Sequence, residues 1–348
     1  MPDTENGKIA WGIITAGKIA RKFCNGVLRS STGKLAAVAA RDGNRANSFA
    51  NEFGIPKYFD SYQALIEDPS VKAVYIGTPH PMHAHWAIAA ATAGKHVLCE
   101  KPIGMNRTEA ENIVSAARQA GVFLMEAFMY RCHPQTARLV ELVRQQRVGD
   151  LRAIRATFSY RGSYDLNGLK LNKKLGGGGI LDVGCYPVSM ARLLAGAALG
   201  KDFAQPLEVS GMAHLGQQSN VDEYATALLK FDNDILAQLA CGVQLEMDNT
   251  VTVFGTEGRI EVLSPWFGSG IEGGSTSMLI KNNSGELQEE IVTATDRWLY
   301  AIEADTVAEN LERGQARSPA MSWEDTLGNM EVLDQWRQCA GLQYSSDN

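Results

Sequence analysis

The chain has 348 residues, of which 45% are apolar and 21% charged, and its formal net charge is −6 at pH 7. This length exceeds what one hydrophobic core usually organises, so two domains are expected. The composition is that of a globular chain, and scattered Lys and Arg in an acidic background argue against nucleic acid as a partner.

Membrane and secretory signals are also missing from the pattern. No apolar run approaches the roughly 20 residues that span a bilayer, and MPDTENGKIAWGII at the N-terminus lacks a basic region followed by an apolar segment. The six cysteines lie far apart without a C-x-x-C pair, which argues against a disulfide framework or a structural zinc site. We therefore expect a cytoplasmic protein with reduced thiols, no metal and no membrane partner.

The first 130 residues alternate short apolar runs with amphipathic stretches. The runs IAWGII, LAAVAA, AVYIG, HVLCE and VFLMEA predict strands, and the stretches between them predict helices. Strands that alternate with helices form a parallel sheet covered on both faces. Residues 1–130 are therefore expected to form an α/β domain.

The first predicted strand leads into TAGKIA, residues 15–20, a degenerate form of the dinucleotide fingerprint G-x-G-x-x-G/A. Its glycines normally permit a tight turn and close approach to a pyrophosphate at a helix N-terminus. Here the first glycine is replaced by Thr15, so a purely structural turn explains the motif equally well. Its position between a strand and a helix favours cofactor binding. The candidate residues are Ala16, Gly17, Lys18 and Ile19.

The second predicted strand ends in AVAARD, residues 37–42. An NAD site tends to place an acid on the ribose hydroxyls near this strand end, whereas this chain offers Ala40 and Arg41. A guanidinium suits a 2′-phosphate and stacks on adenine, so these residues predict NADP in preference to NAD. In the alternative, Arg41 is a solvated surface residue, and Asp42 keeps NAD possible.

The segment YIGTPHPMHAHW follows next. His80, His83 and His85 resemble metal ligands, but no Cys or carboxylate of matching spacing completes a set. Thr78 and Pro79 follow a predicted strand, where open α/β sheets bind ligands. We therefore count Thr78, Pro79 and His83 as cofactor-binding candidates and expect no metal.

After about residue 150 the periodicity changes. Alternating segments such as EYATALLKF are joined by Gly, Asn and Asp turns such as FDND, which predicts an antiparallel sheet. Residues 131–348 are thus expected to form an α+β substrate and oligomerisation domain with a large open sheet. Its uncovered apolar face predicts a homodimer or higher homo-oligomer. Helices are expected at 134–146, 176–195 and 297–340, with the helix at 300–340 packing back at the domain junction.

Three motifs occur in a recognisable order: the degenerate glycine turn, TPHPMHAHWAIAAATAGKHVLCEKP (78–102) and GGGGILDVGCYP (176–187). Together they resemble the Gfo/Idh/MocA oxidoreductase family over nearly the whole chain. The chain looks most similar to the branch with dimeric dihydrodiol dehydrogenases and NADP-dependent D-xylose 1-dehydrogenases. The resemblance implies an N-terminal dinucleotide-binding Rossmann domain, an open antiparallel C-terminal sheet, catalysis at their junction and dimerisation through the sheet face. It also implies a cis Lys101–Pro102 bond.

Oxidation of a carbinol by hydride transfer needs a base for the hydroxyl proton and a cation for the developing alkoxide. We expect Tyr186 to exchange the proton and Lys101 to stabilise the oxyanion and lower the pKa of Tyr186. Asp182 then orients Lys101 or a substrate hydroxyl. Asp182 and Tyr186 share a face if their segment is α-helical, although Pro187 would kink or restart such a helix. In the alternative, Asp182 caps a turn, Tyr186 is a packing residue and Lys101 is a surface lysine.

Four further assignments complete the expected site. Glu100 and Lys101 are assigned to cofactor binding on the nicotinamide side. Tyr130 and Arg131 follow a predicted strand end, and Arg suits hydroxyl-rich or anionic ligands, so both are assigned to substrate binding. An inter-domain salt bridge explains Arg131 equally well.

The expected activity is hydride transfer between NADP and a CH–OH or C=O carbon of a sugar, polyol or cyclic diol. This is chemistry of the aldose 1-dehydrogenase or dihydrodiol dehydrogenase type. Two alternatives stay open. One is an NAD(P)-assisted glycosidase of the same fold, which would recycle its cofactor, and the other is a non-catalytic nucleotide-binding regulator.

Overall fold

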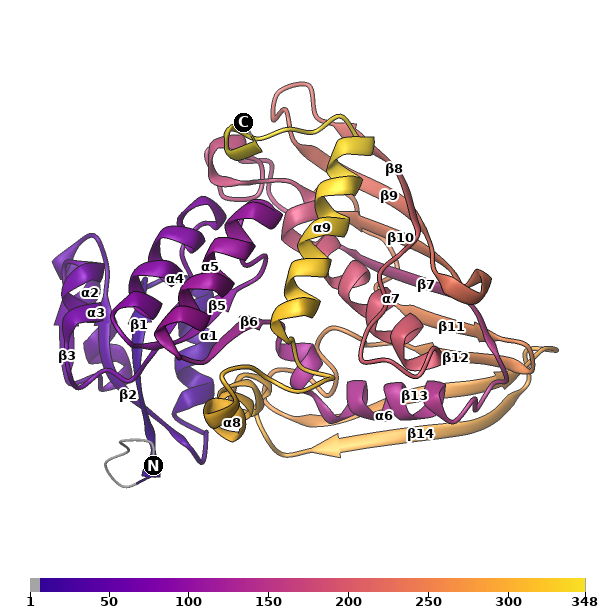
Figure 1. Cartoon of the computed structure of the whole chain (residues 1–348), viewed down its shortest axis with the longest axis horizontal. Helices are drawn as coiled ribbons and strands as arrows, with labels where there is room; N and C mark the ends of the chain where they lie inside the picture. The colour runs from indigo at the N-terminus through magenta and orange to yellow at the C-terminus, as the bar shows by residue number, and fades with distance from the viewer. Residues whose placement is uncertain (1–6, 348) are drawn as a thin grey trace. The chain divides into compact units, whose positions relative to one another are not determined.

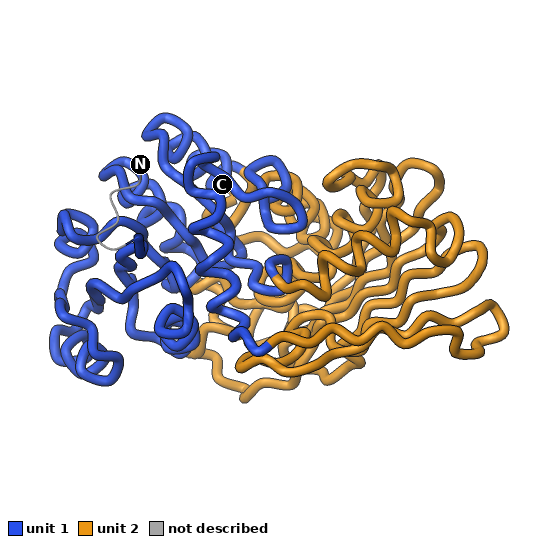
Figure 2. The backbone as a smooth tube through the Cα atoms, turned by 90° about the horizontal axis from the view of Figure 1, so that it is seen from below, with its two compact units in different colours: residues 1–104, 108–132, 296–326 blue, residues 105–107, 133–295, 327–348 orange. Residues whose placement is uncertain are grey.

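The structure, a computed structural model, describes residues 7–347 (Figure 1). Residues 1–6 and 348, which the two expected domains include, lie outside the described residues. Contacts within the chain divide it into two compact units (Figure 2). The first comprises residues 1–104, 108–132 and 296–326, and the second comprises residues 105–107, 133–295 and 327–348.

The first unit contains a six-stranded sheet in the order β3-β2-β1-β4-β5-β6. All neighbouring strands are parallel. The chain order reverses between β1 and β4, which is the point where ligands bind at the carboxyl ends of the strands in Rossmann folds. The strands are β1 (Ile9–Ile14), β2 (Gly33–Ala39), β3 (Lys57–Phe59), β4 (Ala73–Ile76), β5 (His96–Glu100) and β6 (Leu124–Ala127).

Helices connect these strands, and β1, β4 and β6 are buried along their whole length. Burial on both faces explains why these strands read as continuous apolar runs. Although β6 lies at the sheet edge, the Leu124 N–H donates to the Gly314 carbonyl (3.0 Å), so residues 296–326 cover it. The helices are α1 (Lys18–Val27), α2 (Gly43–Phe53), α3 (Tyr62–Glu67), α4 (His83–Thr92) and α5 (Arg107–Ala120).

The expected single helix at 297–340 is wrong. The structure has two helices, α8 (Leu299–Asn310) and α9 (Trp323–Cys339). Gly314 adopts φ +75 and the Ser318–Pro319 bond is cis, and neither geometry belongs to a continuous helix. Helix α8 belongs to the first unit, whereas α9 passes into the second from residue 327 onward.

The second unit is built on an eight-stranded sheet in the order β14-β13-β12-β11-β7-β10-β9-β8. Only the β10–β7 pair is parallel among the neighbouring strands of the described chain. A mostly antiparallel sheet was expected. The strands are β7 (Leu151–Ser159), β8 (Glu208–Leu215), β9 (Asp222–Lys230), β10 (Leu236–Gly242), β11 (Val251–Gly255), β12 (Gly258–Val262), β13 (Gly274–Asn282) and β14 (Leu287–Thr295).

Helices cover one face of this sheet. Figure 1 shows α6 (Pro134–Arg144), α7 (Cys185–Ala198) and α9 over it. Gly211 of β8 permits the approach of α9, since a Cβ there would lie 2.5 Å from Trp336. On the opposite face apolar side chains are exposed, including Met212 (79%), Leu228 (60%) and Val292 (62%). The confirmed fold class is thus a parallel Rossmann sheet plus a large open sheet.

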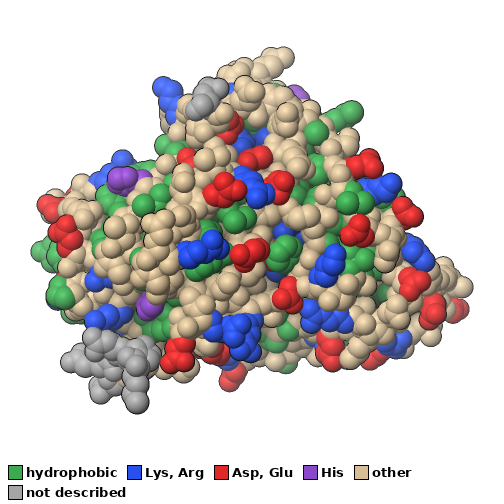
Figure 3. Space-filling view, in the orientation of Figure 1, with side chains coloured by type: hydrophobic (Ala, Val, Ile, Leu, Met, Phe, Trp, Pro, Cys, Tyr) green, Lys and Arg blue, Asp and Glu red, His purple; other side chains and the backbone are tan. Residues whose placement is uncertain are grey.

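The surface charge and one apolar helical stretch are relevant to nucleic-acid and membrane partners. Basic and acidic side chains are interspersed on the face drawn in Figure 3. One helical stretch of the described chain, residues 173–198, is long and apolar enough to cross a membrane, but its apolar window is 100% buried. Such burial is typical of a core helix.

Close packing of α1 on α8 generates a stability prediction. A Cβ on Gly26 would lie 2.5 Å from Tyr300 Cβ and 2.6 Å from the Tyr300 backbone. Gly26→Ala should therefore lower the free energy of unfolding by about 1–3 kcal/mol, as overpacking does, measured by urea titration. The control is Gly43→Ala, where the nearest atom lies 3.5 Å away and no loss is expected. Equal effects of the two substitutions would contradict the packing argument.

Candidate functional site

The turn after β1 closes without its usual glycine. Thr15 adopts φ +87, a conformation that favours glycine, and its hydroxyl accepts the Gly17 N–H at 3.1 Å. Gly17 is the N-cap residue of α1 and provides no side-chain cap. The first turn of α1 therefore presents main-chain N–H groups suited to a pyrophosphate.

The other candidates of this motif surround the turn. Lys18 begins α1 and is exposed, whereas Ala16 is buried. Ile19 packs toward the end of β4, because a Cβ on Gly77 would lie 3.2 Å from its side chain. Ala40, after β2, is 3% exposed and donates its N–H to the Phe59 carbonyl (3.1 Å).

Two guanidinium groups gather beyond the end of β2. Arg41 is exposed, and Arg45 donates to the Ala16 carbonyl at 3.0 Å. Burial raises the pKa of Tyr62, and the charges of Arg41 and Arg45 oppose that rise, so both lie within electrostatic reach of its hydroxyl. Asp42 caps α2 by accepting the N–H groups of Asn44 (2.8 Å) and Arg45 (3.2 Å). Arg45 was missed from the sequence, although it stands four residues after Arg41 at a helix start.

His83 bridges the ends of two neighbouring strands. Its Nε2 lies 2.8 Å from the Thr78 carbonyl and its Nδ1 lies 2.8 Å from the Pro102 carbonyl. Burial lowers the pKa of His83 to about 4, so the ring is neutral at pH 7 and donates to one of the two carbonyls. Both nitrogens contact main chain, so the geometry supports a bracing role for His83. Direct cofactor contact stays a prediction.

Thr78 and Pro79 follow β4. Pro79 precedes a short 3-10 turn that leads into α4. The Thr78 hydroxyl is buried and has no hydrogen-bond partner among the described residues. A buried hydroxyl without a partner is costly, which fits a site completed by a ligand.

The turn that carries Lys101 is held from several sides. Tyr75 donates its hydroxyl to Glu100 Oε1 at 2.6 Å, and the Lys101–Pro102 bond is cis, as the resemblance implies. The Ile103 N–H donates to Glu126 Oε1 at 3.0 Å. Burial raises the pKa of Glu126 to about 7. Lys101 itself is half-buried at the carboxyl end of β5.

A second buried acid stands near Glu100. Glu303 of α8 is 0% exposed, and neither carboxyl oxygen has a hydrogen-bond partner among the described residues. Burial, together with the charge of Glu100, raises the pKa of Glu303 well above its ordinary value. Both effects favour the neutral form of Glu303. No signal in the sequence marks this residue.

Asp182 and Tyr186 belong to the second unit, and their segment is not one regular α-helix, which is the condition on which their expected shared face depends. Residues 180–184 form a π-helix, and α7 begins at Cys185. A π-helix has i→i+5 hydrogen bonds, so its side-chain spacing differs from that of an α-helix. Pro187 falls in the first turn of α7, where its missing N–H disrupts no helical bond. The regular α-helix thus begins two residues before Pro187.

The four glycines before this helix permit close approach of backbone. A Cβ on Gly177 would lie 2.8 Å from the Lys170 carbonyl, and one on Gly178 would lie 2.1 Å from Asp222 Oδ1. Asp222 also accepts the Ile180 N–H at 2.5 Å. Burial raises the pKa of Asp222 to about 7.

Two side chains hold the Asp182 carboxylate. Tyr160 donates its hydroxyl to Oδ2, and Lys170 donates its ammonium to Oδ1, each at 2.5 Å. Burial and the negative charge of Asp182 raise the pKa of Tyr160, so its hydroxyl stays protonated. Neither partner carries a sequence signal, because both lie in or beside the irregular segment before the glycines.

The Tyr186 ring is enclosed by aromatic neighbours. It meets Phe158 edge to face at 4.9 Å between ring centroids and Trp266 at 5.7 Å. Trp266 is anchored by donating its indole N–H to the Thr157 carbonyl at 2.9 Å. Tyr186 is 5% exposed, so its ring orientation is determined by this packing.

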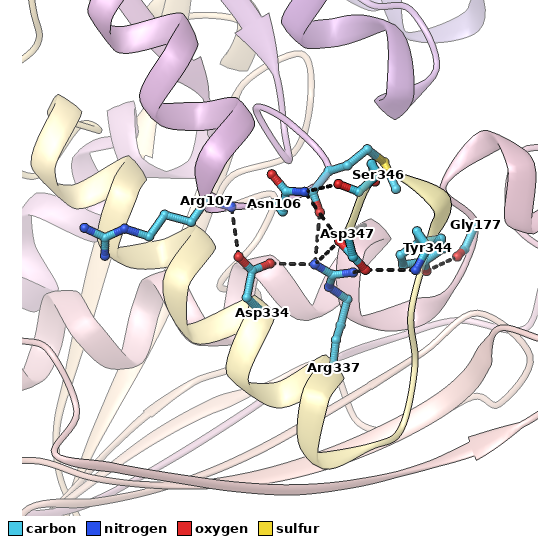
Figure 4. A network of polar contacts seen from close by, with 9 residues as sticks. Asn106, Arg107, Gly177, Asp334, Arg337, Tyr344, Ser346 and Asp347 are labelled. Atoms are coloured by element: carbon cyan, nitrogen blue, oxygen red, sulfur yellow. Dashed lines mark hydrogen bonds and ion pairs between the residues drawn. The ribbon is translucent and has the colours of Figure 1, made fainter.

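A polar network at the C-terminus contacts two segments of the second unit, near Met105 and near Gly177 (Figure 4). Arg337 pairs with Asp347 (2.7 Å) and donates to the Met105 carbonyl (3.1 Å), four residues after Lys101 in sequence. Tyr344 donates its hydroxyl to the Gly177 carbonyl at 2.5 Å. The C-terminal segment thus holds the chain that follows Lys101 and the chain that precedes Asp182.

The two expected substrate-binding residues lie inside the first unit. Tyr130 and Arg131 are each 1% exposed. Arg131 pairs with Asp325 at 2.6 Å and donates Nε to the Pro319 carbonyl. This geometry favours a structural ion pair, made within one unit, and substrate contact by either residue stays a prediction.

No group of three metal-ligating side chains occurs within residues 7–347. His83, the buried member of the histidine-rich segment, contacts two carbonyls, as described above. The polar groups of the first unit instead converge at the carboxyl ends of β1, β2, β4 and β5, which is the arrangement of a dinucleotide site.

Comparison with known proteins agrees with this geometry. Residues 9–128 match a model described as an oxidoreductase family with an NAD-binding Rossmann fold, and residues 136–261 match a GFO/IDH/MocA C-terminal domain. Trans-1,2-dihydrobenzene-1,2-diol dehydrogenase of Mus musculus is 33% identical over 345 residues, covering 97% of this chain and 99% of that protein. The Homo sapiens enzyme is 31% identical with the same coverage.

Among solved structures, a 3-ketoreductase from Actinomadura kijaniata in complex with NADP and TDP-benzene has a TM-score of 0.85 at 27% identity. The match covers 96% of this chain and 98% of that one. The two domain matches, in this order, and relatives of nearly full length show that the chain belongs to the Gfo/Idh/MocA oxidoreductase family.

Proposed function

We propose that this protein is an NADP-dependent oxidoreductase that interconverts CH–OH and C=O at a carbon of a sugar, polyol or cyclic diol. The observation that carries the proposal is the family assignment, in a chain that has Lys101 in its first unit and Asp182 and Tyr186 in its second. Relatives named as a diol dehydrogenase and a ketoreductase support alcohol–carbonyl chemistry.

The residues of the first unit fit NADP. The N-terminus of α1 at Gly17 would hold the pyrophosphate, and Arg41 with Arg45 would hold the 2′-phosphate. Asp42 is engaged in capping α2, which disfavours its use on the ribose of NAD. The Thr78 hydroxyl would gain a partner. When bound, the nicotinamide accepts or donates the hydride.

The chain's own residues would manage the proton and the oxygen. Tyr186, oriented by Phe158 and Trp266, exchanges the proton of the substrate hydroxyl. Lys101 stabilises the negative charge that develops on that oxygen. Asp182, held by Tyr160 and Lys170, orients a substrate hydroxyl.

The state of the cysteines and the exposed face of the second sheet support proposals on cellular location and on oligomeric state. The six cysteines are free thiols, which suits the reducing cytoplasm. The uncovered sheet face exposes Met212, Leu228, Leu236 and Val292. We infer that a second copy of the chain covers this face, giving a homodimer, because monomers rarely expose large apolar patches.

Removal of the Tyr186 hydroxyl tests the catalytic assignment. Tyr186→Phe should lower kcat by about 10²–10⁴-fold, since general acid–base catalysis contributes that much. NADPH affinity, measured by fluorescence titration, should change less than about threefold, because only the proton-transfer group is lost. Turnover is followed at 340 nm over aldoses, inositols, ketoses and trans-dihydrodiols. An active Tyr186→Phe enzyme would refute the assignment, and product without accumulating reduced cofactor would indicate the glycosidase.

The guanidinium groups of Arg41 and Arg45 are proposed to select NADP over NAD. Arg41→Ala and Arg45→Ala should each weaken NADPH binding by about 10–100-fold, the value of a charged hydrogen bond, and leave NADH binding nearly unchanged. Arg21→Ala is the control, since Arg21 pairs with Glu52 and stacks on Phe49. Equal losses for both nucleotides, or tighter NADH than NADPH binding by the wild type, would contradict the NADP assignment.

The homodimer is tested by a charge on the exposed sheet face. Leu228→Asp should convert the dimer to a monomer in light scattering, because the carboxylate would be desolvated in the interface. Leu28→Asp is the matched control in the first unit, where Leu28 is 55% exposed. A monomeric wild type, or a dimer that survives the Leu228 substitution, would overturn the proposal.

A further inference from the structure

Lys170 is a charged residue of the second unit that the proposed mechanism uses only to hold Asp182. Its ammonium lies 2.5 Å from Asp182 Oδ1 and 5.7 Å from the centre of the Tyr160 ring. The two partners differ in environment, since the side chain of Lys170 is 46% exposed and that of Asp182 is 5% exposed. The ammonium therefore lies where a buried carboxylate meets the surface.

The backbone holds Lys170 in this place. Its carbonyl accepts the Gly178 N–H at 2.9 Å, and its neighbour Leu171 is 1% exposed. Gly177 lies so close that a Cβ there would come within 2.8 Å of the Lys170 carbonyl. An irregular segment anchored in this way delivers its side chain at a defined point, unlike a surface lysine on a mobile loop.

The chemistry of the pair suits a hydroxyl group. A hydroxyl both donates and accepts, and a carboxylate only accepts whereas an ammonium only donates. Asp182 Oδ1 uses one of its lone pairs on Lys170, and an ammonium has three N–H donors, of which one serves Asp182. The couple can therefore accept the proton of a substrate hydroxyl at Asp182 and donate to its oxygen from Lys170.

We propose that Lys170 is a specificity-determining residue that, with Asp182, recognises a hydroxyl adjacent to the reacting carbinol. The inference rests on the proposed function and narrows its substrate class to vicinal diols, in cyclic or sugar form. A site built to bind a hydroxyl discriminates against analogues without it, because the donor and the acceptor aimed at that hydroxyl then lose its hydrogen bonds. An ordinary exposed ion pair would have no such effect on substrate choice.

The experiment compares a vicinal diol with a matched mono-alcohol. Wild type, Lys170→Met and Lys173→Met are assayed with NADP on trans-cyclohexane-1,2-diol and on cyclohexanol. Lys170→Met should lower kcat/KM for the diol by about 10–100-fold, the loss of a charged hydrogen bond, and for cyclohexanol by less than about threefold. Lys173 is an exposed lysine of the same segment, at the start of the 3-10 turn Lys173–Leu175, so Lys173→Met should behave as wild type.

Equal losses on both alcohols in Lys170→Met, or no loss on the diol, would overturn the inference. Binding of the diol to the NADPH complex, followed by tryptophan fluorescence, separates the two proposals. One outcome is that the wild type binds the diol, that Lys170→Met weakens this binding, and that neither enzyme turns the diol over. In that case the inference on Lys170 stands, whereas the proposed reaction fails on these probes. If the wild type does not bind the diol, the inference fails whatever the turnover of cyclohexanol.

Discussion

The bridge made by His83 is the contact on which the first unit's site depends. Its two ring nitrogens lie 2.8 Å from the carbonyls of Thr78 and Pro102, which follow the neighbouring strands β4 and β5. Complete burial keeps the ring neutral and strengthens the hydrogen bond it donates. The Ile103 N–H to Glu126 contact supports the same turn from β6. Lys101 therefore projects from a turn whose geometry is set by three strands.

Burial influences the ionisation of the carboxyl groups near this turn. Glu100 takes a hydrogen bond from Tyr75, and the nearby Glu303 is driven toward its neutral form by burial and by the charge of Glu100. Two carboxyl groups close together in a low-dielectric interior do not both ionise. The arrangement therefore disfavours a second negative charge near Glu100.

In the second unit, the backbone and its aromatic neighbours position Tyr186 in the first turn of α7. Glycines 176–179 let the backbone pass against Lys170 and Asp222, and the π-helix that follows changes the direction of successive side chains. Phe158 and Trp266 then hold the Tyr186 ring, while Tyr160 and Lys170 hold Asp182. Rigid support from packed elements suits the proton-transfer role proposed for Tyr186, because small misplacements of a reacting group are costly.

The sequence by itself determined the fold class, the family and the strand ends that carry Gly17, Arg41, Thr78 and Lys101. Those conclusions rest on local patterns: apolar periodicity, glycine and proline punctuation and motif order. Local patterns also misled, since residues 297–340 read as one helix but break around Gly314, and residues 180–184 wind as a π-helix.

Only the tertiary structure decided the partners. Several contacts join residues that are far apart in sequence and that no sequence pattern links. They are Arg45 with Ala16, Arg131 with Asp325, Lys170 and Tyr160 with Asp182, and Glu303 near Glu100. The physical reason is that hydrogen bonds and desolvation depend on distances between side chains that the path of the whole chain sets, whereas periodicity reports only which face of an element is buried.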